Sequence, residues 1–218
     1  MARGKENQKT SKSENTKRHI ISSFLKLMDE KPWEKITVIE ICRSAEITRG
    51  TFYQYFGDLY DLVEQLEHSL LEDLSARLSS LPGASGPHCR AEDFLTKYDY
   101  EPPQSFLIWF EFCRDHSDAM MALLDRRNGD AYFVKKLKTV LKDSIEQVME
   151  RDSTANDELR SHFLKVFMDL HILAAQTWLE SEEKDGEDEA GYLSVDDIVN
   201  LLNTMRVGSA YLNYCRKK

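Results

Sequence analysis

The sequence predicts an all-α protein with an N-terminal three-helix domain and a larger helical C-terminal domain. Apolar residues recur at helical spacing along most of the 218 residues, and no segment alternates apolar and polar residues between turns as a strand would. Glycine and proline are scarce, at nine and five residues, whereas Leu, Glu, Lys and Ala are plentiful. Charge separates the two parts of the chain.

The N-terminal part is basic and the remainder is acidic. Residues 1–57 hold 11 Lys and Arg against 7 Asp and Glu, which gives a net charge of +4. Residues 58–218 hold 18 against 31, which gives −13. This asymmetry is typical of a protein that contacts phosphate at one end only. Charge alone leaves open that the basic segment is a solvated tail.

The first elements follow one another closely. Residues 1–15 are polar, and we expect them to form a disordered basic arm. A helix follows and ends before Pro32, which cannot continue its hydrogen bonds. Thr37, with Glu40 three residues later, has the spacing of a capping box and predicts the start of a second helix. The apolar face of the first helix comprises Ile21, Phe24, Leu25 and Met28.

A third, short helix completes the predicted N-terminal domain, residues 16–57. Thr48 is its expected N-cap, and we expect it to run from Arg49 to about Phe56. Phe52 and Phe56 are four residues apart and should share the core face. Two short helices joined by a tight turn and preceded by a third form a helix-turn-helix pattern.

The outward face of this third helix is small, uncharged and rich in hydrogen-bonding groups. Gln54 can pair with the N6 and N7 atoms of adenine, and Gly50 allows a close approach of the backbone. The hydroxyl of Tyr53 can reach phosphate oxygens, and Arg49 can bind a guanine edge or a phosphate. The predicted DNA contacts are Thr37, Thr48, Arg49, Gly50, Thr51, Tyr53, Gln54 and Tyr55.

The rest of the chain, residues 58–218, is predicted to be helical with few interruptions. A leucine stripe from Leu59 to Leu81 indicates a long helix, and the Pro- and Gly-rich residues 82–87 indicate a linker. An acidic loop is expected over residues 180–189. The further helices are expected from about residue 103, after 117, over 131–150, from 157 to about 179, and over 194–214.

The N-terminal motif resembles the DNA-binding domain of the tetracycline-repressor (TetR) family over about residues 19–66. The resemblance implies a DNA-binding transcriptional regulator, most often an effector-responsive repressor that binds a near-palindromic operator as a homodimer. The alternative is a protein of the same fold that acts as an activator or is controlled by a protein partner. The matching residues are Ile36-Thr37-Val38, Ile41-Cys42, Ala45, Ile47-Thr48-Arg49-Gly50-Thr51-Phe52-Tyr53, Tyr55-Phe56 and Leu62.

Two positions depart from the family pattern. Glu46 stands in the turn where the family usually has glycine, and Leu59 stands where the family often has a lysine that meets a phosphate. Lys12, Lys17 and Arg18 could supply the missing phosphate contact. Neither departure changes the helix that faces the bases.

The resemblance also implies a small-molecule effector pocket and a dimer face within residues 58–218. For any single apolar residue, a place in the core is the simpler interpretation. The predicted pocket residues are Trp109, Phe110, Cys113, Met120, Met121, Phe133, Phe167 and His171. The predicted dimer residues, on the last two long helices, are Leu170, Ala174, Ala175, Trp178, Leu201, Leu202 and Met205.

Several classes of protein are disfavoured by the sequence. It contains no GxSxG, GxGxxG, P-loop or HExxH motif, so we expect neither an enzyme nor a bound cofactor. The four cysteines form no CxxC pair, and no metal site is expected. No apolar run approaches the ~20 residues that cross a bilayer, and the N-terminus lacks a secretory signal. We therefore expect a cytoplasmic protein without a membrane partner.

Overall fold

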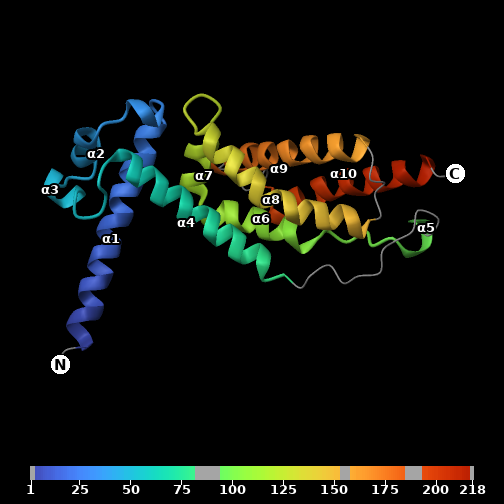
Figure 1. Ribbon diagram of the computed structural model, residues 1–218, viewed down its shortest axis with the longest axis horizontal. Coiled ribbons are helices and arrows are strands. Elements are labelled where there is room, and N and C mark those ends of the chain that lie inside the picture. The colour runs from blue at the N-terminus through green and yellow to red at the C-terminus, as the bar shows by residue number, and fades with distance from the viewer. Residues whose placement is uncertain (1–2, 82–93, 153–157, 185–192, 217–218) are drawn as a thin grey trace. The chain divides into compact units, whose positions relative to one another are not determined.

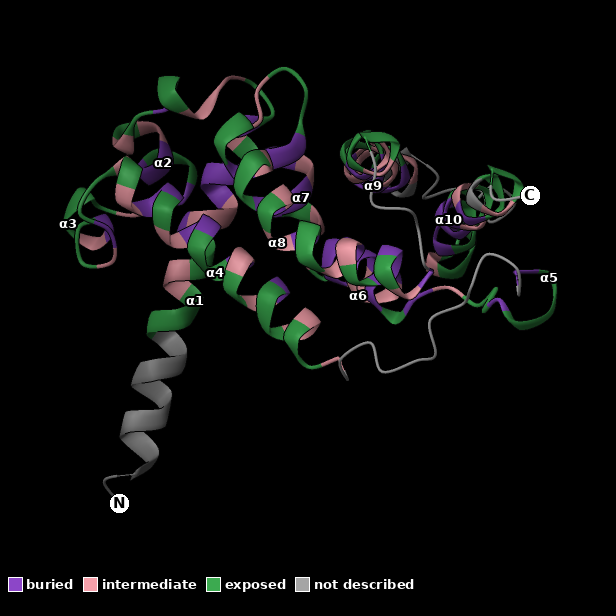
Figure 2. Cartoon of the chain, turned by 45° about the vertical axis from the view of Figure 1, so that its right-hand side comes forward, coloured by how far each residue is buried: buried purple, intermediate pink, exposed green. Residues whose placement is uncertain are grey.

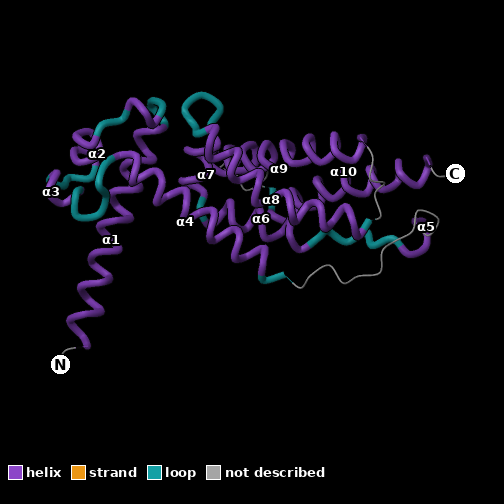
Figure 3. The backbone as a smooth tube through the Cα atoms, viewed as in Figure 1, coloured by secondary structure: helices purple, strands orange, loops and turns teal. Residues whose placement is uncertain are grey.

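The computed structural model describes residues 3–81, 94–152, 158–184 and 193–216. All elements in these ranges are helices joined by loops, as Figure 3 shows. The predicted all-α class is therefore confirmed. No helix in these ranges is long and apolar enough to cross a membrane.

The chain divides into two compact units. The first contains residues 1–70 and 118–133, and the second contains residues 71–117 and 134–218. Helices α4 (Leu59–Ser79) and α8 (Ala131–Arg151) contribute to both units. The division therefore lies beyond Gly57, where the sequence predicted the end of the N-terminal domain.

The first unit is built around α1 (Arg3–Met28), beside which α2 (Val38–Ser44) and α3 (Arg49–Phe52) lie in Figure 1. A short 3-10 helix, η1 (Trp33–Lys35), precedes α2 and was not predicted. Most of α7 (Ser117–Leu124) also belongs to this unit. Its fully buried side chains include Ile20, Phe24, Met28, Ile41, Phe52, Phe56 and Leu62.

Helix α1 begins earlier than the sequence predicted. It starts at Arg3, within residues 1–15, which were expected to be a disordered arm. This segment lacks an apolar face, but its Lys, Glu and Gln residues have good helix propensity. The helical register of residues 20–28, of which Ile20, Phe24 and Met28 are fully buried, can therefore continue toward the N-terminus.

The loop between α7 and α8 packs tightly against itself. The backbone N–H groups of Gly129 and Asp130 donate to the carbonyl oxygens of Asp125 and Leu123, at 3.0 and 2.9 Å. A Cβ at residue 129 would lie 2.6 Å from the Leu123 carbonyl oxygen, so only glycine fits. The Asn128 amide donates to the Asp29 carbonyl just after α1, at 3.3 Å, and joins this loop to α1 within the first unit.

The second unit contains α5 (Phe94–Lys97), α6 (Gln104–Asp115), α9 (Glu158–Lys184) and α10 (Val195–Arg216), with most of α8. Helix α5 is only four residues long and was not predicted from the sequence. The other helices lie close to their predicted bounds, except that α9 continues to Lys184, through the first half of the acidic segment that was expected to be a loop. The rest of that segment, residues 185–189, lies outside the described residues. Figure 2 shows α9 and α10 nearly end-on, with exposed residues along one side of each.

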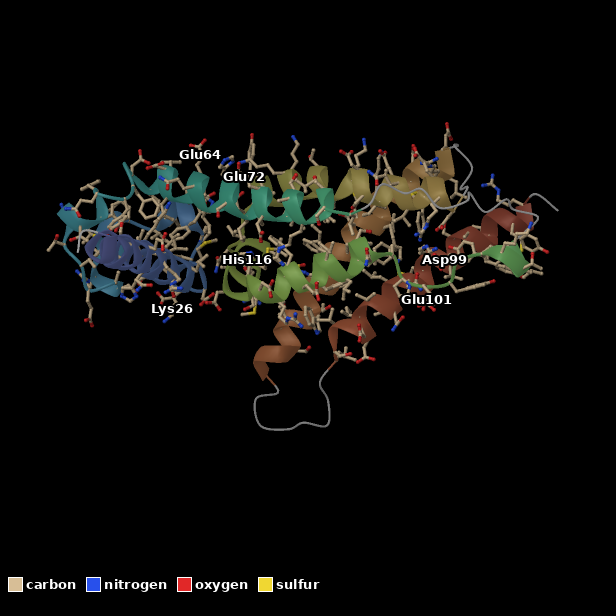
Figure 4. All side chains as sticks on the ribbon, turned by 90° about the horizontal axis from the view of Figure 1, so that it is seen from below. Lys26, Glu64, Glu72, Asp99, Glu101 and His116 are labelled. Carbon is tan, nitrogen blue, oxygen red and sulfur yellow. The ribbon has the colours of Figure 1, made fainter. Side chains whose placement is uncertain are left out.

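A buried arginine joins three segments of this unit. Arg206 of α10 is 3 % exposed, and its Nε donates to Asp152 at 2.8 Å. Its two terminal nitrogens donate to the carbonyl oxygens of Asp99 and Glu101, each at 2.7 Å. Figure 4 shows Asp99 and Glu101 beside α10. The Tyr98 hydroxyl also donates to Asp152, so the guanidinium and its counter-charge are both hydrogen-bonded.

Candidate DNA-binding interface

The start of α2 is fixed by the predicted capping box. The Thr37 hydroxyl accepts from the Glu40 backbone N–H at 3.3 Å, and the Glu40 carboxylate accepts from the Thr37 N–H at 2.9 Å. Lys31 donates to the same carboxylate at 2.6 Å. The hydrogen bonds from Lys31 and then from Thr37 lower the pKa of Glu40 to about 2. The cap prediction is confirmed. The Thr37 hydroxyl is exposed but already takes part in hydrogen bonds with Glu40.

The turn between α2 and α3 depends on a left-handed residue. Glu46 has φ 51°, which glycine adopts more easily than any other residue. The Ile47 N–H donates to the Cys42 carbonyl at 2.9 Å, which is the six-residue bond of a Schellman motif. Glu46 thus occupies the position usually taken by glycine in that motif. The departure noted in the sequence leaves the turn intact.

Helix α3 is shorter than predicted. The Thr48 hydroxyl caps it by accepting from the Thr51 N–H at 3.1 Å, but regular helix ends at Phe52. The Gln54 and Tyr55 N–H groups then donate to Thr51 and Phe52, three residues back, so the chain tightens into a turn.

The two faces of α3 and this turn are divided as predicted. Phe52 and Phe56 are buried, and their rings pack 5.6 Å apart. Gly50 and Gln54 are exposed, and Tyr53 is 54 % exposed. A Cβ at Gly50 would meet only the Thr48 hydroxyl, at 3.7 Å, so the surface here is open. Of the remaining predicted contacts, Thr37, Thr48 and Arg49 are exposed, and Thr51 and Tyr55 are half-buried.

A hydrogen-bond network holds α3 against the start of α4. Gln65 donates to the Asp61 carboxylate at 2.9 Å and to the Tyr55 carbonyl at 3.5 Å. Lys17 donates to Gln65 at 2.7 Å, and its ammonium lies 5.5 Å from the centre of the Phe56 ring. Lys17 is therefore bound within the protein. Lys17 is half-buried, whereas Arg18, another of the cations predicted to replace a lysine at position 59, is exposed.

One aromatic contact was absent from the predicted site. Tyr60, in the first turn of α4, is 67 % exposed and meets the edge of Trp33 at 5.4 Å. Its hydroxyl can bind a phosphate oxygen from the helix start where Leu59 cannot. Tyr60 could have been predicted as a phosphate contact, because it directly follows position 59, where the family often has a lysine.

The predicted pocket residues are divided between the two units. Met120, Met121 and Phe133 belong to the first unit, and Met121 is only half-buried. The second unit holds the others, all buried: Trp109, Phe110, Cys113, Phe167 and His171. Burial raises the pKa of the Cys113 thiol well above its usual value.

The predicted dimer residues also fall into two groups. Trp178 is 2 % exposed, packs edge-on against Phe110 at 5.8 Å and donates to the Leu193 carbonyl at 2.8 Å. With Ala175 and Leu202 it is buried in the chain's own core, so these three residues are not available to a partner. The remaining four are accessible: Leu170 and Ala174 are half-buried, and Leu201 and Met205 are exposed.

Comparisons with known proteins agree with this architecture. Residues 20–66 match the family model of bacterial regulatory proteins, tetR family. The chain is 38 % identical over 50 residues to the HTH-type transcriptional regulator HbdR of Aromatoleum sp. (strain CIB). This match spans 23 % of the chain and 22 % of that protein.

Solved structures extend the similarity of the fold beyond this domain. A TetR transcriptional regulator from Streptococcus agalactiae 2603V is 19 % identical, with a TM-score of 0.57 over 94 % of this chain and 98 % of its own. A regulator from Syntrophomonas wolfei is 15 % identical, with a TM-score of 0.56 over 90 % and 95 %. The exposed α3 surface, the family-model match over α1 to α4 and the shared fold lead to one assignment. Residues 20–66 form a DNA-binding domain of the tetR family, and the chain as a whole has the fold of solved TetR regulators.

Proposed function

We propose that the chain is an effector-responsive repressor that binds a near-palindromic operator as a homodimer. The exposed surface of α3 and of the turn after it carries the DNA-binding part of this proposal. The side chain of Phe52 is buried in the core, whereas Gly50, Tyr53 and Gln54 are exposed to solvent. A short exposed helix can enter the major groove, and the Gln54 amide offers both a donor and an acceptor to base edges.

The other exposed groups suit the DNA backbone. Arg49 supplies the positive charge at the start of α3, and the hydroxyls of Tyr53 and Tyr60 are accessible to phosphates. The Thr37 and Thr48 hydroxyls are engaged in caps, so their part is to hold the helix starts in place.

A homodimer is supported by two exposed apolar faces in the second unit. A helix as short as α3 contacts few base pairs, and a twofold pair doubles the site. On α10, Leu201 is 53 % and Met205 is 40 % exposed, and Leu212 continues the same stripe. On α9, Leu159 and Val166 are exposed, and Leu170 and Leu173 are half-buried beside them. Such faces on two neighbouring helices suit a four-helix interface between copies.

The test of the dimer is a pair of substitutions on α10. Met205→Arg places a charge in the apolar stripe, whereas Asn200→Arg places the same charge on an exposed position outside it. We expect Met205→Arg to yield monomers in sedimentation and to lose operator binding, with Asn200→Arg unchanged. Met205→Arg dimers as tight as the unsubstituted protein would exclude this face.

An effector response is supported by the connection of α6 to α4. The Asp73 carboxylate of α4 lies 2.8 Å from the His116 Nε2, and Arg77 donates to Asp115 at 2.7 Å. Figure 4 shows His116 beside α4. A ligand that moves α6 would therefore move α4, which continues into the DNA-binding unit.

The direction of regulation is tested with a selected operator. After binding-site selection, a reporter placed behind that sequence should be silenced when the chain is expressed. A reporter that rises instead would make the protein an activator.

A further inference from the structure

We propose that the effector is a neutral, mainly apolar molecule that carries a hydroxyl or N–H group, and that His171 accepts the hydrogen bond from this group. The inference rests on the effector response proposed above and specifies its ligand. It comes from two buried polar atoms, on α9 and α6, within the second unit.

The hydrogen bonding of His171 determines its tautomer. The side chain is 1 % exposed, and Nδ1 lies 2.8 Å from the Phe167 carbonyl oxygen. A carbonyl can only accept, so Nδ1 must carry the proton. Burial lowers the pKa of His171 to about 4, so the ring is neutral near pH 7. Nε2 is then a bare acceptor.

Nε2 has no hydrogen-bond partner among the described residues. The neighbouring rings of Phe106 and Phe167, with centres at 4.8 and 4.5 Å, offer no conventional donor. The Ser105 hydroxyl is also buried, and it too has no hydrogen-bond partner among the residues that the structure describes. Buried polar atoms are normally paired, so two such atoms in one apolar region indicate a ligand that supplies the missing bonds.

The two atoms belong to facing helices. Ser105 lies one turn before Trp109 on α6, and the Trp109 indole N–H donates to the His171 carbonyl at 3.3 Å. Phe106, next to Ser105, contacts the His171 ring directly. The serine hydroxyl can both donate and accept, so it can bind the oxygen of an alcohol whose proton goes to Nε2.

The ligand must displace an aromatic ring to reach these atoms, because neither has accessible surface. Phe163, Phe167 and His171 follow one another at four-residue spacing along α9. Phe163 is the outermost and half-buried, and it stacks on Phe167 at 5.0 Å. Phe167 in turn packs against Phe106 of α6 at 5.7 Å, so a ligand that displaces Phe163 and then Phe167 would open the α6–α9 contact. Helix α6 is joined to α4 through Asp73 and Asp115.

A carboxylate is the wrong partner for this position. Its oxygens only accept, so they would face the lone pair of Nε2, and its charge would lose solvation among phenylalanines. An alcohol or phenol donates one hydrogen bond and carries no charge. The site should therefore bind apolar alcohols and phenols in preference to apolar carboxylates.

The experiment uses three probes that share a 4-propylphenyl frame and differ in the group opposite the propyl chain: 4-propylphenol, 4-propyltoluene and 4-propylbenzoate. Binding to the full chain is measured by calorimetry for the unsubstituted protein, His171→Phe, Ser105→Ala and the control His162→Phe, whose histidine is exposed on the same helix. The ratio of phenol to toluene affinity should fall roughly three- to tenfold in His171→Phe, as expected for one lost hydrogen bond. His162→Phe should keep the ratio. Ser105→Ala should lower it less.

A second measurement reads the acceptor directly. In protein labelled with ¹⁵N-histidine, the ring signals of His171 should show a proton on Nδ1, and the phenol should shift the Nε2 signal where the toluene does not. A proton on Nε2, equal ratios in His171→Phe, no binding of the phenol, or tighter binding of the benzoate would each overturn the proposal. Phenol binding through His171 that leaves operator affinity unchanged would retain the site and refute the effector response.

Discussion

Gln54 and Tyr53 are sequence neighbours with different expected roles on DNA. Gln54 points away from the buried Phe52 and Phe56, so its amide is expected at a base edge, whereas the Tyr53 hydroxyl is expected at a phosphate. Gln54→Ala should relax the preference at one base pair in each half-site and cost roughly 1–3 kcal/mol on the best sequence. Tyr53→Phe should weaken operator and random DNA by similar factors.

Binding-site selection on both variants at one salt concentration checks this pair. Both should keep the native melting temperature, because neither side chain is in the core. A changed consensus in Tyr53→Phe together with an unchanged one in Gln54→Ala would reverse the assignment.

His171 makes stability depend on pH in a defined window. Its pKa is about 4 in the folded chain against the ordinary value of 6.5, so the unfolded chain takes up the proton first. Stability should therefore fall as pH drops from about 6.5 to 4, by about 3 kcal/mol for a shift of this size. Urea unfolding of the unsubstituted protein and His171→Phe measures the difference between their pH profiles. Parallel profiles would mean that His171 titrates normally.

At the scale of elements, helical periodicity located most helices and their buried faces. The Phe52–Phe56 spacing identified the core face of α3, and Thr37 with Glu40 identified the start of α2. The short α5 was missed because four residues are too few to show a period. The end of α3 at Phe52 was missed because a 3-10 turn continues the same apolar spacing.

Replacing each of two glycines with alanine should change the stability of the protein in opposite directions. Gly129→Ala should destabilise the protein by about 1–3 kcal/mol, because a Cβ there would overlap the Leu123 and Asp125 carbonyl oxygens. Gly208 lies within α10, and a Cβ there meets nothing within 4 Å. Gly208 lies on the same face of α10 as Met205, so the test uses the monomeric Met205→Arg variant. In that variant, Gly208→Ala should stabilise the chain by about 0.5–1 kcal/mol through helix propensity. Denaturant midpoints at fixed protein concentration compare the two, and equal effects would contradict the loop geometry.

At the scale of the whole molecule, the sequence could not assign each apolar face to a partner. Periodicity showed that α9 and α10 have apolar residues around much of their surface, but it could not tell the chain's own core from an interface with another copy. Trp178 was therefore placed on the dimer face, whereas it is buried beside Phe110. The exposed Leu159 and Val166, on the other side of α9, were overlooked for the same reason.

The division of charge predicts how operator binding responds to salt. Residues 1–57 carry a net charge of +4 on a chain whose total is −9, so phosphate contacts must come from this end. Each such contact contributes ~0.9 to the slope of log affinity against log salt. Deleting residues 1–15, which include Lys5, Lys9 and Lys12, should flatten that slope by about one unit.

Because α1 begins at Arg3, the deletion also shortens a helix, and a second variant separates the two effects. Replacing Lys5, Lys9 and Lys12 with glutamine removes the charges and retains residues of good helix propensity. The triple variant should reproduce the flatter slope, and its melting temperature should match that of the unsubstituted chain. If the slope falls in the deletion but not in the triple variant, the length of α1 matters and its lysines do not. If it falls in neither, this segment lies off the DNA, and Arg49 with the remaining cations of residues 16–57 must account for the entire salt dependence.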